Sequence, residues 1–278
     1  MAVSETPTLD VERALAADGH DLIVGFDEVG RGSLAGPVMV GAAAVWSRDL
    51  PDLTVPDGVA DSKMLTERRR EAICDPLKDW CAAWAVGAAS NDEIDEWGIG
   101  YALGVAALRA LDRVEHTLGL GGPLGGRAAG TPSADSAAVP TVMVGDAPIG
   151  TPADSSADVP ADVPTGAPSS AFMRVAGILD GPHDYITKAI GTFDAPAIPV
   201  APTMTTMVKG DRHCATVAAA AVIAKVTRDR LMVDIAAAHP EWEAYGWAAN
   251  KGYGSAVHRR AIADLGPTPL HRISWKLT

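Results

Sequence analysis

The chain has 278 residues, which is enough for one large domain with a substantial buried core. Its hydrophobic content of 47% and charged content of 21% are ordinary for a soluble globular protein. The formal net charge of −12 argues against a partner that is held mainly by positive charge, such as nucleic acid, although charge alone excludes nothing.

Targeting signals and disulfides are not expected. Residues 1–21 carry acids early and contain no apolar run followed by a cleavage site, which argues against a secretory signal. The alanine-rich stretch Ala215–Ala224 is far shorter than the roughly 20 residues of a membrane span, so we expect no membrane partner. Three cysteines without a CxxC pair favour a reducing, cytoplasmic location.

The first 120 residues predict a hairpin followed by helices and a third strand. An apolar run ends on Asp27–Glu28, a glycine turn follows, and a second β-branched run comes next, which favours a hairpin over a βαβ unit. Pro76 is expected to end the first helix. The predicted elements are strands over Leu22–Phe26, Val38–Trp46 and Trp80–Ala89, a helix over Ser62–Asp75, and a loop and long helix over Asn91–Leu118.

Residues 121–170 differ in kind from the rest of the chain. They contain 8 Gly and 8 Pro and no aromatic residue, and Thr131–Pro140 is nearly repeated as Thr151–Pro160. Such a segment cannot bury enough apolar surface to offset its ordering entropy. We expect a disordered insertion within one domain that spans 22–278, preceded by an N-terminal extension over 1–21. Without the insertion the remaining net charge is −8.

The C-terminal part predicts two more strands and two helices. Met173–Leu179 is a strand that ends on Asp180–Gly181, and a further strand lies within Ile198–Val208. Lys209–Asp211 leads into a long helix to about Ala238, and a last helix runs over Ser255–Leu265. Early strands followed by alternating helices indicate a mixed α/β protein with a partly antiparallel sheet.

Asp27 and Glu28 form an acidic pair at the end of the first strand. Taken alone, such a pair is most often a solvated strand end. The apolar strand before it and the glycines after it favour a functional role instead. Adjacent carboxylates repel each other, and a hard cation such as Mg²⁺ removes that repulsion because it prefers carboxylate oxygens.

Two further carboxylates can join this pair. Asp180 precedes a glycine at a strand end and, alone, suggests a turn; Asp211 starts a helix and, alone, suggests an N-cap. Taken together with Asp27 and Glu28, they can converge at one edge of the sheet. Four carboxylates form an oxygen cage suited to a pair of Mg²⁺ or Mn²⁺ ions.

The segment Gly30–Ala35 matches the G-x-G-x-x-A pattern of dinucleotide-binding proteins, but the context does not. A helix should open at the third glycine position, whereas Gly36–Pro37 and a second strand follow here. Gly30, Arg31 and Gly32 instead favour close approach of bare backbone to a sugar or phosphate, with Arg31 as a donor. A 2′-hydroxyl is the group that distinguishes RNA from DNA at such a place.

Basic and aromatic residues supply further candidates for substrate contact. Lys63 follows Asp61 at a helix start, where either a cap or a phosphate contact fits. Tyr253 is either a core aromatic or a residue that stacks on a sugar or base. His258 and His271 are candidates for phosphate contacts or local structure. The C-terminal stretch predicts a basic face made of Lys251, Arg259, Arg260, Arg272 and Lys276.

Read as an ordered set, these blocks resemble the ribonuclease HII family. The resemblance extends from Leu22 to Trp275 apart from 121–170. Its blocks are Gly25–Gly32 with Leu34–Val38, Asp61–Lys63, Ile178–Gly181, Lys209–Asp211, Ala218–Asp229 and Asn250–Gly254. Val29 stands where alanine is common, and Thr216 and Ala221 stand where serines are common. Thr216 keeps a hydroxyl, whereas Ala221 does not.

The resemblance implies an RNase H-like fold with a five-stranded mixed sheet flanked by helices and a C-terminal helical extension. It implies that Asp27, Glu28, Asp180 and Asp211 are catalytic carboxylates that bind metal, and that Gly30, Arg31, Gly32 and Tyr253 sense the ribonucleotide at an RNA–DNA junction.

The expected reaction is hydrolysis of the RNA strand of RNA–DNA hybrids and cleavage on the 5′ side of ribonucleotides embedded in DNA. Two Mg²⁺ or Mn²⁺ ions would take part, leaving 3′-hydroxyl and 5′-phosphate ends. We expect a monomer. The related ribonuclease HIII is disfavoured because it normally carries an extra N-terminal domain. The alternative from another class is a catalytically silent nucleic-acid-binding module on the same fold.

Overall fold

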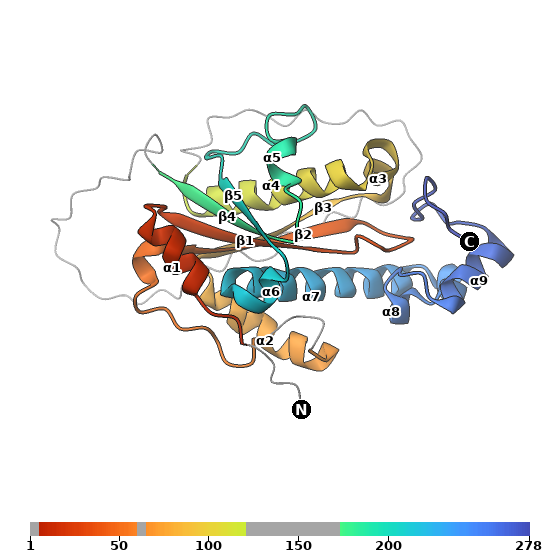
Figure 1. Cartoon of the computed structure of the whole chain (residues 1–278). Coiled ribbons are helices and arrows are strands. Elements are labelled where there is room, and N and C mark those ends of the chain that lie inside the picture. Colours follow the sequence, from red (N-terminus) through yellow and green to blue (C-terminus); the bar gives the residue numbers. More distant parts are fainter. Residues whose placement is uncertain (1–5, 60–64, 121–172) are drawn as a thin grey trace, which may run out of the picture.

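The computed structural model describes residues 6–59, 65–120 and 173–278, and its centre is a five-stranded sheet with helices on both faces (Figure 1). The strand order is β3-β2-β1-β4-β5. The first three strands pair antiparallel, whereas β4 and β5 run parallel to β1. The strands are β1 (Leu22–Val29), β2 (Val38–Trp46), β3 (Ala83–Ala89), β4 (Val175–Asp180) and β5 (Thr203–Met207). The predicted mixed sheet is confirmed.

The helices divide between the two faces and a C-terminal extension that continues beyond the sheet (Figure 1). Helix α4 covers one face and α7 the other, while α8 and α9 belong to the extension. The α-helices are α1 (Asp10–Ala17), α2 (Glu67–Trp80), α3 (Asn91–Trp97), α4 (Ile99–Thr117), α5 (Ile186–Ala189), α6 (Gly210–His213), α7 (Ala215–Ala238), α8 (Trp247–Asn250) and α9 (Ala256–Leu265). Short 3₁₀ helices are η1 (Ser47–Asp49) and η3 (Pro240–Tyr245).

Small residues allow both central helices to lie close to the sheet. A Cβ atom at Gly25 would stand 2.3 Å from the carbonyl carbon of Thr216 in α7, and one at Gly87 would stand 2.0 Å from the carbonyl oxygen of Ala106 in α4. Either atom would overlap the helix backbone. The alanine-rich start of α7 is therefore a packing surface, and Ala218, like its neighbours, is fully buried.

The alternation of side chains along β1 determines which face each functional residue occupies. Val24 and Phe26 pack in the cluster that includes Leu103 of α4, whereas Ile23 packs in the cluster that includes Val217 of α7. Successive strand residues point to opposite faces. Asp27 therefore belongs to the α7 face of the sheet, and Glu28, the next residue, belongs to the α4 face.

The first long helix differs from the prediction at both ends. Helix α2 begins at Glu67, where the hydroxyl of Thr66 caps it by accepting from the Arg69 amide. It continues through Pro76 to Trp80, so the predicted stop at Pro76 is wrong. Pro76 has no backbone N–H to donate within the helix, but tertiary contacts stabilise the last turn. Leu77 is fully buried, and Trp80 Nε1 donates to the Thr54 carbonyl over 2.8 Å.

The described part of the N-terminal segment packs against the sheet-containing domain. Leu9 is buried in the same cluster as Ile23 and Val217, and Glu12 of α1 is fully buried. Residues 6–21 thus continue the packing of the α7 face. The predicted insertion at 121–170 lies outside the described residues and stays a prediction. None of the described helices combines the length and apolar character that spanning a membrane requires.

Candidate active site

Two of the predicted carboxylates lie near the carboxyl ends of neighbouring parallel strands. The parallel register of β1 and β4 pairs Phe26 with Leu179, and Asp27 and Asp180 follow these residues. Both belong to the α7 face, because Ile178, two positions before Asp180, packs in the α7-side cluster. Asp27 is only 5% exposed. The carboxyl ends of two adjacent central strands therefore bring these carboxylates to the same place.

The third carboxylate, Asp211, lies in α6, which follows β5 after a short turn. Lys209 adopts a left-handed backbone conformation with φ 60°, which turns the chain from β5 into α6. The amide of Gly210 donates to Asp180 Oδ1 over 2.7 Å, and Asp211 is the next residue. Asp211 is 3% exposed. The turn after β5 thus ties α6, which carries Asp211, to the carboxylate that ends β4.

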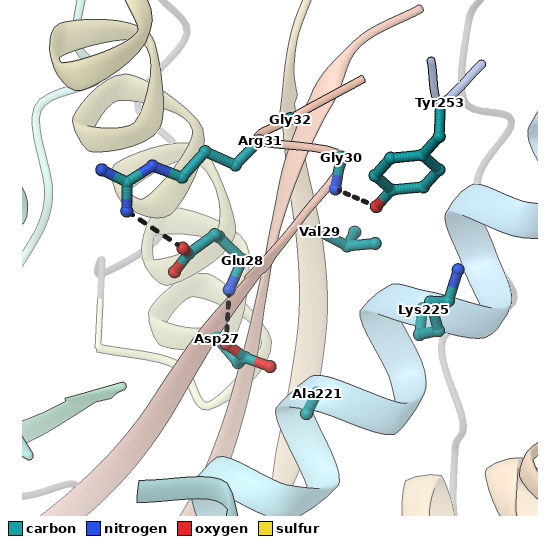
Figure 2. A pocket seen from close by; sticks show the side chains of 9 residues that line it. All are labelled: Asp27, Glu28, Val29, Gly30, Arg31, Gly32, Ala221, Lys225 and Tyr253. Carbon is teal, nitrogen blue, oxygen red and sulfur yellow. Dashed lines mark hydrogen bonds and ion pairs between the residues drawn. The ribbon is translucent and has the colours of Figure 1, made fainter. Parts of the chain in front are cut away.

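Glu28 stands apart from the other three carboxylates. Its carboxylate lies 3.4 Å from the guanidinium of Arg31 (Figure 2). It also accepts a long hydrogen bond of 3.4 Å from the hydroxyl of Tyr185. Its own amide donates to Asp27 Oδ1 over 2.9 Å. Among the residues that the structure describes, no group of three or more His, Cys, Asp or Glu side chains is arranged to hold a metal ion.

The donor chemistry nevertheless fits a hard divalent cation. Asp27 and Asp211 are nearly buried, and Asp180 ends the strand between β1 and β5, so the three carboxylates belong to one edge of the sheet, where desolvation makes negative charge costly. Carboxylate oxygens are the preferred ligands of Mg²⁺ and Mn²⁺. Asp27, Asp180 and Asp211 fit such an ion, and Glu28 departs from the expected cage because strand alternation directs it to the other face.

A pocket beside Asp27 gathers most of the predicted substrate-binding residues (Figure 2). Its lining includes Asp27, Glu28, Val29, Gly30, Arg31, Gly32, Ala221, Lys225 and Tyr253. The hydroxyl of Tyr253 accepts from the Gly30 amide over 3.1 Å. Arg31, by contrast, extends toward Glu28 and away from Tyr253. Lys63, also predicted to bind substrate, lies outside the described residues.

Gly30 and Gly32 differ in whether the described structure requires a glycine at their position. Gly30 has φ +80°, and a Cβ atom there would stand 2.1 Å from Nε of Arg228. Gly32 has an ordinary φ, and a Cβ atom there would have no atom of the described chain within 4 Å. Nothing in the described chain therefore requires glycine at 32, and the open space leaves room for an incoming group.

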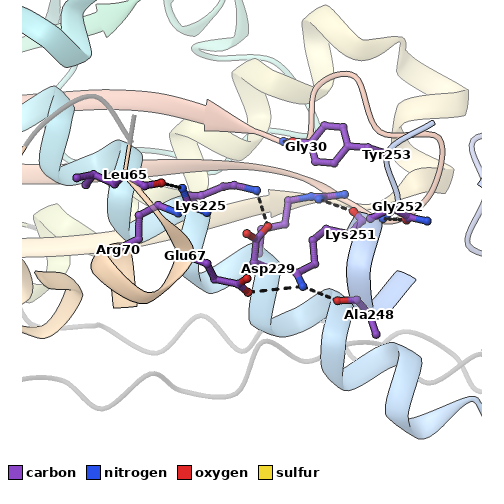
Figure 3. Close-up of polar contacts among 12 residues, drawn as sticks. Gly30, Leu65, Glu67, Arg70, Lys225, Asp229, Ala248, Lys251, Gly252 and Tyr253 are labelled. Atoms are coloured by element: carbon purple, nitrogen blue, oxygen red, sulfur yellow. Dashed lines mark hydrogen bonds and ion pairs between the residues drawn. The ribbon is translucent and has the colours of Figure 1, made fainter. Parts of the chain in front are cut away.

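Lys225 is a pocket residue that the sequence motifs did not single out. Its ammonium lies 2.7 Å from Asp229 Oδ1 and 5.6 Å from the ring centre of Tyr253 (Figure 3). Its side chain is 25% exposed. Ala221 precedes it by one helical turn and also lines the pocket. The four-residue spacing within Ala218–Asp229 is the signal that could have identified this face of α7.

Two buried arginines shape the glycine loop. Arg228 donates to the carbonyls of Pro37, Lys251 and Ala35 over 2.9, 2.9 and 3.1 Å. Arg272 donates to three more carbonyls, those of Gly30, Arg31 and Gly36, over 2.7–3.2 Å. Both side chains are fully buried.

The predicted basic face is therefore smaller than expected. Arg272 is fully buried and Lys251 is only 9% exposed, because their donors are used inside the protein. Lys251 also lies 3.7 Å from the carboxylate of Glu67 (Figure 3). Arg259, Arg260 and Lys276 remain exposed.

His258 and His271 form a buried pair behind Tyr253. Nδ1 of His258 lies 2.9 Å from the Tyr253 carbonyl, so it carries the hydrogen and donates. Its Nε2 accepts from Trp247 Nε1 and from His271 Nε2, each over 3.0 Å. His271 Nδ1 in turn accepts from the Thr268 amide over 2.8 Å. This pattern assigns both histidines to local structure, as neutral rings that hold the backbone of Tyr253.

Burial of the histidine pair predicts a loss of stability in acid. Desolvation, with a contribution from the neighbouring His258, lowers the pKa of His271 from 6.5 to about 4. As the pH falls from 6.5 toward 4, His271 binds a proton in the unfolded chain but stays neutral in the folded protein. The free energy of unfolding therefore decreases. Urea unfolding between pH 7 and pH 5 should show a smaller stability loss in His271→Gln than in the parent protein. His183→Gln, at an exposed histidine, should keep the parental pH dependence. Equal slopes in His271→Gln and the parent would contradict this account.

The family model for ribonuclease HII matches residues 24–113 and 188–278. The chain belongs to the ribonuclease HII family. Ribonuclease HII from Streptomyces avermitilis is 37% identical over 272 residues, covering 98% of this chain and 84% of the relative. The enzyme from Roseiflexus castenholzii is 34% identical over 276 residues, covering 99% and 91%.

A solved structure supports the fold at lower identity. The Mn²⁺ complex of Bst-RNase HIII has a TM-score of 0.57 and 19% identity, covering 96% of this chain and 71% of that one. The predicted RNase H-like fold is confirmed, and the antiparallel β1–β2 hairpin rules out the dinucleotide-binding interpretation.

Membership establishes the general activity. The chain is a type 2 ribonuclease H, an endonuclease of a metal-dependent family that acts on RNA–DNA substrates. The catalytically silent alternative is thereby set aside. The matched segments include Asp27, Glu28, Asp211 and Tyr253, whereas Asp180 lies between them. The individual role of each of these residues stays a prediction.

Proposed function

We propose that this enzyme hydrolyses the RNA strand of RNA–DNA hybrids and cuts on the 5′ side of single ribonucleotides embedded in duplex DNA. The products would carry 3′-hydroxyl and 5′-phosphate ends. The observation that carries the proposal is that carboxylates lie at the carboxyl ends of the adjacent strands β1 and β4, and that one of them, Asp27, shares a pocket with the glycine loop and Tyr253.

In this proposal the carboxylates hold metal and take no part as an acid–base pair. Asp27, Asp180 and Asp211 would supply oxygen ligands from the α7 face. Glu28, the fourth proposed ligand, would have to turn away from Arg31 and Tyr185 to join them. Two Mg²⁺ or Mn²⁺ ions, when bound, would stabilise the charge that develops on the attacking and leaving oxygens. The hydrogen bond from the Gly210 amide to Asp180 keeps one oxygen of that carboxylate directed toward α6.

Discrimination of ribose would come from the pocket. The Tyr253 hydroxyl accepts from the Gly30 amide, which leaves its own hydrogen available for a 2′-hydroxyl. The open space at Gly32 allows the sugar to approach bare backbone. Lys225 and Arg31 are positively charged and partly exposed, so each can contact a phosphate next to the ribonucleotide. Lys63 is proposed as a further phosphate contact at a helix start.

The acidic composition is compatible with this substrate when the footprint is small. The pocket places the cationic side chains of Arg31 and Lys225 at the glycine loop, where each can contact a phosphate even though the net charge is −12. We propose that the enzyme is a monomer in the cytoplasm and that it acts where ribonucleotides remain in newly made DNA.

Metal removal tests the proposed function. The enzyme should cleave a labelled RNA–DNA hybrid in Mg²⁺ or Mn²⁺, lose this activity when EDTA is added in excess, and recover it when Mg²⁺ is restored. An all-DNA duplex of the same sequence should stay intact under every condition. Cleavage that persists in EDTA, or equal cleavage of the all-DNA duplex, would overturn the proposal.

A further inference from the structure

Glu12 of α1 is a fully buried carboxylate with partners far along the chain. Its Oε1 accepts two hydrogen bonds from Thr216, one from the amide over 2.9 Å and one from the hydroxyl over 2.8 Å. Its Oε2 is buried and has no hydrogen-bond partner among the described residues. Burial raises the pKa of this carboxyl, while the two bonds from Thr216 oppose the shift. A side chain kept at such a desolvation cost requires an explanation.

The N-terminal segment supplies the cap that α7 lacks. Cys214, at the N-cap position of α7, makes no side-chain capping bond. The first free amides of the helix are satisfied from elsewhere: the Ala215 amide donates to the Thr8 carbonyl over 2.9 Å, and the Thr216 amide donates to Glu12. The Thr8 amide in turn donates to the His213 carbonyl over 3.0 Å. Thr8 and Glu12 thus bind both sides of the α6–α7 junction.

This junction connects two of the carboxylates of the site. Asp211 lies in α6, and Cys214 alone separates α6 from the start of α7. On its other side, the Thr216 backbone packs directly on Gly25, two residues before Asp27, where a Cβ atom would stand 2.3 Å away. Any movement of the first turn of α7 therefore changes the placement of Asp211 relative to β1.

We propose that Glu12 is a positioning residue for the metal site: it fixes the first turn of α7 against β1 and so sets the distance between Asp211 and the strand-end carboxylates. The inference rests on the proposed function, in which these carboxylates hold metal. What Glu12 supplies is a hydrogen-bond acceptor in a fixed place. Glutamine keeps that acceptor at Oε1, and its amide nitrogen replaces the oxygen that has no partner.

The test compares Glu12→Ala with Glu12→Gln, and uses Asp18→Ala as a control at an exposed acid in the same segment. We expect Glu12→Ala to weaken Mn²⁺ binding, measured by calorimetry without substrate, by about tenfold, as is typical when a group that orients a metal ligand is removed. The Mg²⁺ concentration for half-maximal cleavage should rise similarly, whereas KM for the duplex should stay unchanged. Glu12→Gln and Asp18→Ala should remain within about twofold of the parent.

Hydrogen exchange in the metal-free protein separates this inference from the proposed function. Exchange of the Ala215 and Thr216 amides should accelerate in Glu12→Ala and stay parental in Glu12→Gln. Faster exchange with a parental metal midpoint would overturn the positioning role, as would a Gln variant as defective as the Ala variant. If the parent itself binds no Mn²⁺, the proposed function fails instead. If Glu12→Ala does not fold, Thr216→Val can replace it, because this change removes only the hydrogen bond from the hydroxyl. It should raise the Mg²⁺ concentration for half-maximal cleavage by a smaller factor. An unchanged Mg²⁺ concentration would again overturn the inference.

Discussion

Replacing Asp27 by asparagine should reduce cleavage of a duplex with one ribonucleotide by about three orders of magnitude, while leaving the protein folded. Asparagine has nearly the same shape, and its carbonyl oxygen can still accept the hydrogen bond from the Glu28 amide. It lacks the negative charge that a hard cation requires. The loss therefore concerns the metal, and single-turnover rates in saturating Mg²⁺ together with the thermal midpoint of unfolding would measure it.

Two further variants make this result specific. Asp180→Asn should give a comparable loss, because its carbonyl oxygen can keep the bond from the Gly210 amide and only the charge disappears. Asp264→Asn, at an exposed acid of α9, should retain parental activity. Undiminished cleavage by Asp27→Asn with Mg²⁺ would contradict the assignment of the carboxylates.

Arg272→Ala should have the largest effect on stability. The fully buried guanidinium satisfies the carbonyls of Gly30, Arg31 and Gly36. Its removal leaves these acceptors without their partner and opens a cavity, for a combined cost of about 3–5 kcal/mol in the free energy of unfolding. Urea denaturation would measure the loss. Because the same carbonyls belong to the glycine loop, activity below the melting transition should also fall.

Arg260→Ala is the matched control, since Arg260 is an exposed arginine of α9. Its free energy of unfolding should remain within about 0.5 kcal/mol of the parent. If Arg272→Ala proved as mild as Arg260→Ala, the loop would not depend on the buried arginine, and this account of its shape would be wrong.

The carboxylates could be located from the sequence because the relevant signals are local. Asp27 and Asp180 each follow an apolar strand, and parallel strands place their carboxyl ends on one edge of a sheet. The two-residue period of a strand also applies to Glu28, and it explains why this neighbour faces α4. The placement of Asp27 and Asp180 at one edge of the sheet was thus predictable from pattern, whereas the direction of Glu28 needed the fold.

The supporting residues were not predictable, because their roles depend on contacts between distant parts of the chain. Arg272 looks like a surface cation in the sequence, yet its partners lie 236–242 positions away. Glu12 looks like an exposed helix residue, and its partner Thr216 is 204 positions away. Pro76 looks like a helix end, and only the burial of Leu77 shows why the helix continues.

In the proposed function, the carboxylates hold the metal that cuts beside a ribonucleotide, and the glycine loop and Tyr253 select that ribonucleotide. The most direct measurement is a cleavage-site map on a DNA duplex with one embedded ribonucleotide, in Mg²⁺ and separately in Mn²⁺. We expect a single cut on the 5′ side of the ribonucleotide, with a 3′-hydroxyl on one fragment and a 5′-phosphate on the other. Cleavage elsewhere in the duplex, or fragments with a 2′,3′-cyclic phosphate that would indicate attack by the 2′-hydroxyl, would contradict it.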